Sequence, residues 1–156
     1  MVLFNRAFTG VFIGGLIAAA LDIIYAIVLT LRAGHSAIGT LQAIASGLVG
    51  AEAFQGGIPA AALGLFLHCA ILIIAAAIYY EASLRLPVLR ARAIVCGLLF
   101  GVLVYLFMNF IVIPLSAIPF TISYTPWKLA QGFLSHAILV GLPIALTIRR
   151  FTDQKN

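Results

Sequence analysis

Charged residues are scarce in this chain of 156 residues: they make up 8% of it, and only four of them are acidic. Soluble domains are about a quarter charged, so this composition excludes a domain surrounded by water. Polar spacers at helical intervals are also missing, because the apolar residues come in blocks of roughly twenty, the length that crosses the hydrocarbon core of a bilayer. The sequence therefore predicts an integral membrane protein.

Further absences narrow the class. Strands of about ten residues with alternating polarity are missing, which excludes a transmembrane β-barrel. The two cysteines, Cys69 and Cys96, lie at predicted depths that differ by about 13 Å, too far apart for a disulfide. No Ser–His–Asp arrangement, phosphate-binding Gly-rich loop, H-E-x-x-H motif or cysteine cluster is present. We therefore do not expect an enzyme.

What the sequence does contain is a set of long apolar segments. We predict an all-α fold, a single domain over residues 1–156 with four membrane-spanning helices at about residues 7–31, 58–80, 93–117 and 129–148. The first connection carries a helical pattern over residues 36–51, which begins at a plausible N-cap, Ser36. This segment is too short and too rich in glycine to span, so we expect an interfacial or re-entrant helix.

The distribution of basic residues predicts the orientation. Seven of the nine basic residues fall on one side of the predicted bundle: Arg6, Arg85, Arg90, Arg92, Arg149, Arg150 and Lys155. Only Arg32 and Lys128 fall on the other. Because basic connections stay in the cytoplasm, we expect a multi-pass protein of the bacterial inner membrane with both termini inside. Membrane lipids are then the expected surroundings, and we expect no contact with nucleic acid.

Each predicted span contains one strongly polar residue. Counted from the outer ends of the helices, Asp22, His68, Asn109 and His136 lie at a similar depth, slightly outside the membrane midplane. Small residues lie four positions away along the same helix faces, where they let other backbones approach closely. These predicted packing glycines are Gly10, Gly14, Gly64, Gly97, Gly101 and Gly132. We therefore expect a bundle whose four polar residues face inward as one layer.

Several functions are compatible with this polar layer. The first is a hydrogen-bonded core, with Tyr25 and Tyr105, in an accessory or scaffold subunit of a larger membrane assembly or a homo-oligomer. The second is a proton-linked site, because a carboxylate between two imidazoles can titrate near neutral pH. The third is axial haem b ligation by His68 and His136, or a metal site that includes Asp22. A pocket for a lipid or small molecule is a fourth. We expect the accessory subunit first and no bound cofactor.

The second half of the chain resembles a known family. It contains G-L-F-L-H at 64–68, Y-Y-E-A-S-L-R-L-P at 79–87, P-L-S-A-I-P-F at 114–120 and T-P-W-K at 125–128, followed by a span with His136. Over about residues 58–150 this pattern is similar to the YagU-type inner-membrane proteins, which are associated with acid resistance. The resemblance implies an inner-membrane location and this topology, and it favours the proton-linked hypothesis.

Overall fold

The computed structural model describes residues 2–153, so Lys155 lies outside the described residues. All regular structure in residues 2–153 is helical. The elements are α1 (Val2–Arg32), α2 (Ala37–Val49), η1 (Gly50–Gln55), α3 (Gly57–Arg85), α4 (Val88–Ala91), α5 (Ala93–Phe107), η2 (Met108–Val112), α6 (Ile113–Leu115), α7 (Pro126–Ser135), η3 (His136–Gly141) and α8 (Leu142–Asp153). The segment α5–η2–α6 is one continuous helix, and so is α7–η3–α8.

Five helices are long and apolar enough to cross a membrane: Arg6–Arg32, Ala37–Gln55, Gly57–Arg85, Ala93–Leu115 and Pro126–Asp153. The predictions of an all-helical fold and of long apolar helices are confirmed. These are the features of a multi-pass helical membrane protein. Four of the helices correspond to the predicted spans, and the fifth, Ala37–Gln55, contains the segment predicted to be interfacial or re-entrant.

Three helices extend about five residues beyond the predicted spans, because α1 begins at Val2, α3 ends at Arg85 and α8 ends at Asp153. Two other boundaries differ from the prediction for local reasons. The third long helix ends at Leu115, two residues earlier than expected, because Ser116 is extended. The next amide, that of Ala117, donates to the carbonyl oxygen of Gly47 in α2 (3.0 Å) instead of continuing the helix. The fourth begins at Pro126, three residues earlier than expected, because the Thr125 hydroxyl accepts from a free amide of its first turn and caps it.

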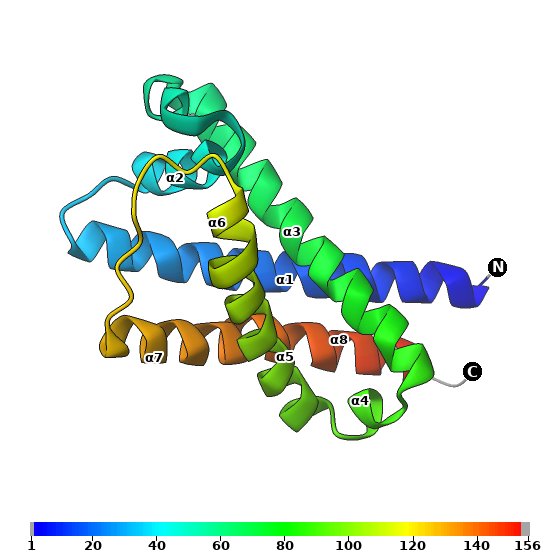
Figure 1. Ribbon diagram of the computed structural model, residues 1–156. Helices are drawn as coiled ribbons and strands as arrows, with labels where there is room; N and C mark the ends of the chain where they lie inside the picture. The colour runs from blue at the N-terminus through cyan, green and yellow to red at the C-terminus, as the bar shows by residue number, and fades with distance from the viewer. Residues whose placement is uncertain (1, 154–156) are drawn as a thin grey trace.

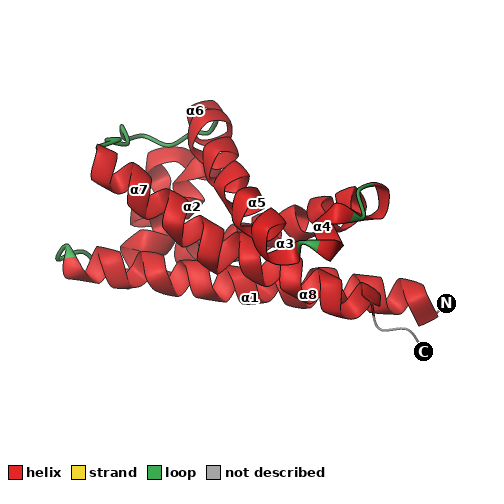
Figure 2. Cartoon of the chain, turned by 90° about the horizontal axis from the view of Figure 1, so that it is seen from below, coloured by secondary structure: helices red, strands yellow, loops and turns green. Residues whose placement is uncertain are grey.

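The long helices form a bundle with two distinct ends. α1 and the α7–α8 helix lie side by side, while α3 and α5 cross this pair at an incline (Figure 1). Both chain ends lie at one end of the molecule, and the α1–α2 turn and the start of α7 lie at the other (Figures 1 and 2). Arg90 of α4 is 3.8 Å from Asp153 at the end of α8, measured from Nη1 to Oδ1. The basic α3–α5 connection therefore lies at the same end as the termini.

α2 packs closely against the first part of α3. Its N-cap is the predicted one, because the Ser36 hydroxyl accepts from the Gly39 amide (2.9 Å). A side chain on Gly64 of α3 would overlap with the Leu41 carbonyl oxygen, so the two backbones touch there. The buried amide of Gln42 donates to the Gly57 carbonyl oxygen (3.2 Å) and ties the middle of α2 to the start of α3. The polar face of α2 is thus turned toward protein.

Small residues also bring the other helices together. The buried core at the α1–α3–α8 junction includes Ala18, Ala19, Ala75, Ala76, Ala93 and Ala145, with Tyr79, Val140, Ile144 and Ile148. Where α5 crosses η3, a Cβ on Gly101 would overlap with the His136 carbonyl oxygen, and one on Gly141 would overlap with the Gly97 carbonyl oxygen. We call Gly97, Gly101 and Gly141 the glycine seam.

The other packing glycines predicted from the sequence also face a second helix. Their nearest neighbours are Phe151 for Gly10, Thr147 for Gly14 and the Tyr105 ring for Gly132. Two further packing glycines are not among those predicted: Gly15, where a Cβ would meet the Ile73 backbone of α3 at 2.7 Å, and Gly141 of the glycine seam.

Candidate functional site

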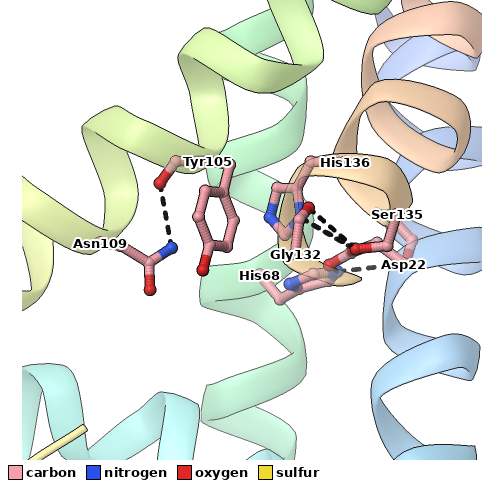
Figure 3. A network of polar contacts seen from close by, with 8 residues as sticks. Asp22, His68, Tyr105, Asn109, Gly132, Ser135 and His136 are labelled. Carbon is pink, nitrogen blue, oxygen red and sulfur yellow. Dashed lines mark hydrogen bonds and ion pairs between the residues drawn. The ribbon is translucent and has the colours of Figure 1, made fainter. Parts of the chain in front are cut away.

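Three of the four predicted polar-layer residues meet inside the bundle (Figure 3). Oδ2 of Asp22 in α1 is 3.9 Å from Nε2 of His68 in α3. Oδ1 of Asp22 is 3.9 Å from Nδ1 of His136, the first residue of η3. Asp22 is 15% exposed, and the two imidazoles are 10% and 21% exposed. We call these three residues the acid–imidazole cluster.

Main-chain carbonyl groups fix which imidazole nitrogen carries the proton. His68 Nε2 is 3.1 Å from the Ala19 carbonyl oxygen, and His136 Nδ1 is 3.1 Å from the Gly132 carbonyl oxygen. A carbonyl oxygen can only accept, so each of these nitrogens carries a hydrogen. The second nitrogen of each neutral ring is therefore a hydrogen-bond acceptor.

The Asp22 carboxyl group lies near both rings without bonding directly to either. Its two contacts of 3.9 Å are longer than a hydrogen bond. Within residues 2–153 its oxygens have no hydrogen-bond donor at closer range. A carboxylate in the middle of a spanning helix costs about 2.5–3.5 kcal/mol to insert, so it requires a proton, water or a cationic partner. Asp22 lines two cavities that could hold water or a cationic partner.

The two long helices in the second half of the chain each carry their predicted polar residue in an irregular turn. Asn109 lies in η2 and His136 opens η3, and both elements are π-helical turns. Each turn is followed two residues later by a proline, Pro114 or Pro143. Proline lacks an amide hydrogen and its ring pushes away the carbonyl group four residues earlier, which disturbs the regular helix. Widened turns of this kind are frequent at functional sites.

Asn109, the fourth predicted member of the layer, is directed elsewhere. Its side-chain amide donates to the Tyr105 carbonyl oxygen one turn earlier in the same helix (2.9 Å). The main-chain carbonyl oxygen of Asn109 accepts from the Tyr124 hydroxyl (3.1 Å). The residue of α5 that touches the cluster is Tyr105, whose ring packs edge-on against His136 with 5.1 Å between centroids (Figure 3). The side-chain nitrogen of Asn109 is thus engaged within its own helix.

Asp22 and His136 line two different cavities. One cavity, of about 520 Å³, lies toward the end of α1 and the start of α7 and is also lined by Tyr25, Lys128 and Gln131. We call it the polar cavity after these side chains. A second cavity, of about 540 Å³, lies beneath α2 and has an almost entirely apolar lining. His68 lines only the second. The carboxyl group of Asp22 thus stands between a polar and an apolar space.

The geometry disfavours the metal hypothesis. Within residues 2–153 no three His, Cys, Asp or Glu side chains come together in a way that could hold a metal ion. The imidazole nitrogens that face Asp22 donate to main-chain carbonyl groups, so a haem iron would be ligated by the second nitrogen of each ring.

Other residues beside the acid–imidazole cluster have weaker sequence signals than its three members. Ser135 lies beside His136, with its hydroxyl 3.4 Å from Nδ1 and bonded to the Gly132 carbonyl oxygen (3.1 Å). Lys128 and Gln131 also line the polar cavity. Lys128 precedes His136 by just over two helical turns, so helical spacing could have indicated it, whereas Gln131 lies well round the helix from His136 and has no such signal.

Comparisons of this chain with family models, with curated proteins and with solved structures found no match.

Proposed function

We propose that this chain is a non-enzymatic, proton-linked protein of the bacterial inner membrane, in which Asp22 takes up and releases a proton. The observation that carries the proposal is the position of Asp22, 3.9 Å from an imidazole nitrogen on each of two other helices. The carboxyl group is also exposed to a polar cavity on its outer side. A carboxyl group between two imidazoles can share a proton with them, and the cavity supplies a route by which the proton arrives.

The proposed topology has four spans, with both termini and α4 in the cytoplasm. It is supported by the meeting of Arg90 with Asp153, which brings the basic connection to the end that holds the termini. It is also supported by the path of α2. This helix starts just after the outer turn, and its Gly47 bonds to Ala117 beyond the outer end of α6. Both ends of α2 then lie on the outer side, as expected of an interfacial or re-entrant helix.

The accessory-subunit hypothesis remains the main alternative, with other membrane subunits or a second copy as partners. It requires a surface suited to a protein partner, and no described residue marks one apart from the apolar faces that lipid would also cover. We favour the proton-linked role because it accounts for a costly carboxyl group beside open cavities. The resemblance of residues 58–150 to the YagU-type proteins, with their association with acid resistance, agrees with this choice.

Infrared difference spectroscopy between acidic and neutral pH tests the proposal on the protein in vesicles. The chain has only four carboxylic side chains, so the carboxyl band of Asp22 can be assigned with a single variant, Asp22→Asn. We expect a titrating carboxyl band that is lost in Asp22→Asn and displaced along the pH axis in His68→Gln. The change His35→Gln, in the exposed α1–α2 turn, serves as the matched control and leaves the band in place.

The proposal fails if the spectrum of Asp22→Asn equals that of the wild type. It also fails if the Asp22 band keeps one protonation state across the pH range in which the protein stays folded.

A further inference from the structure

The apolar cavity beneath α2 continues as a groove between α3 and α5. Its second part has a volume of about 420 Å³ and is lined by Ile74, Ile78, Leu103 and Phe107 among others. Three residues line both parts, namely Ile71, Met108 and Val112. We call the two parts together the apolar groove. Each part has the volume of a typical small-molecule site.

Hydrogen-bonding capacity in the groove is concentrated at one end. Two of its polar lining residues are already engaged, because the Thr40 hydroxyl donates to the Ser36 carbonyl oxygen (3.4 Å) and the Ser116 hydroxyl to the Ile113 carbonyl oxygen (2.7 Å). The other polar lining residues are the acid–imidazole cluster itself. A ligand in this groove would therefore have an apolar body and a polar group placed at Asp22.

The chemistry of the cluster specifies that polar group. The hydrogen on each imidazole is used by a main-chain carbonyl group, so a neutral ring has only an acceptor nitrogen left for a ligand. The Asp22 carboxylate adds two more acceptors and one negative charge. None of the described residues that line the groove is Lys or Arg. The combination matches a hydrogen-bond donor with a positive charge and disfavours a carboxylate or phosphate.

We propose that the apolar groove binds a lipophilic amine, whose protonated nitrogen pairs with Asp22 and displaces the proton held there. This inference rests on the proposed function and deepens it by naming the ligand class. The exchange is balanced: a neutral carboxyl group releases one proton to the polar cavity, and the resulting carboxylate pairs with the entering ammonium group. The titratable groups that share the two cavities with Asp22 are His68, His136, Tyr25, Tyr105 and Lys128.

Binding of three matched probes tests the proposal in phosphatidylcholine vesicles that contain the full chain. The probes are a dansyl-labelled decylamine, its neutral N-acetyl derivative and the corresponding carboxylic acid. Trp127, the single tryptophan of the chain, is the energy-transfer donor, and empty vesicles give the background. We expect saturable binding of the amine, weakened at least about tenfold in Asp22→Asn, since a charge-assisted hydrogen bond is lost. Acidification should weaken amine binding as well, because it protonates the carboxylate.

A second variant tests the contribution of the groove independently of the charge on Asp22. Ala43 of α2 lines the groove without belonging to the cluster, so Ala43→Phe should reduce amine binding and leave the infrared band of Asp22 intact. The proposal is overturned if the amine binds equally to Asp22→Asn or to Ala43→Phe. Equal binding of the acetylated or acidic probe also overturns it, since the groove would then accommodate any apolar chain, as a lipid-filled crevice does.

The two proposals can fail separately. If the Asp22 band titrates but the amine does not bind, the ligand assignment is wrong and the proton-linked function stands. If the band does not depend on Asp22, the proton-linked function is wrong whatever the amine does.

Discussion

The two sides of α5 differ in how closely they meet the rest of the bundle. Toward η3 and α8, the glycine seam lets backbones touch, and Ala145, whose Cβ faces Gly97, is almost completely buried. Toward α3, large side chains such as Leu103 and Ile74 stand 61% and 59% exposed along the apolar groove. In a bilayer, lipid is as apolar as these side chains, so helices associate only where shape allows close packing. The acid–imidazole cluster lies where the closed side and the open side meet.

The largest expected contrast is between a truncation in the closed core of the bundle and one along the groove. We expect Ile144→Ala to lower the free energy of unfolding by about 2–4 kcal/mol, because it opens a cavity in the buried core at the α1–α3–α8 junction. Leu103→Ala should change it by less than about 0.5 kcal/mol, because that side chain faces the groove. Unfolding in mixed detergent micelles measures both. Equal losses would mean that α3 and α5 are in fact packed together.

A smaller contrast in the free energy of unfolding is expected between two glycine-to-alanine substitutions, which add a methyl group instead of removing side-chain atoms. Gly101→Ala should lower the free energy of unfolding by about 1–3 kcal/mol, because the new methyl group overlaps with the His136 carbonyl oxygen. Gly47→Ala is the matched control, since its Cβ would have Ser116 Cβ as nearest atom at 3.8 Å. We expect that change to be neutral or to stabilise by up to about 1 kcal/mol through helix propensity. A destabilised Gly47→Ala with an unaffected Gly101→Ala would reverse the assignment of the closed side.

The sequence predicted the parts of the fold that depend on length and spacing. Long apolar blocks indicated the long helices, and counting residues from the helix ends brought Asp22, His68 and His136 to one depth. A shared depth does not determine, however, which way each side chain points around its helix. The Asn109 side chain donates to the Tyr105 carbonyl oxygen one turn earlier in its own helix, because a carbonyl group of the preceding turn is always within reach of a short side-chain amide.

The groove and the widened turns could not be predicted in the same way. The sequence contains Pro114 and Pro143, but whether a proline ends, bends or widens a helix depends on what packs beside it. The groove results from how α3 and α5 incline relative to the α1–α8 pair (Figure 1), and crossing angles depend on contacts between helices. The hydropathy of a single helix does not indicate these contacts between helices.

Proton release upon amine binding tests the central claim most directly. Vesicles that contain the protein are held in weak buffer, at a pH where the infrared band shows Asp22 protonated, and the labelled decylamine is added while a pH dye is followed. We predict one proton released for each amine bound by the wild type, and none from Asp22→Asn. Amine binding without proton release, or equal release from the variant, would contradict the role of Asp22 as the exchange point between the polar cavity and the apolar groove.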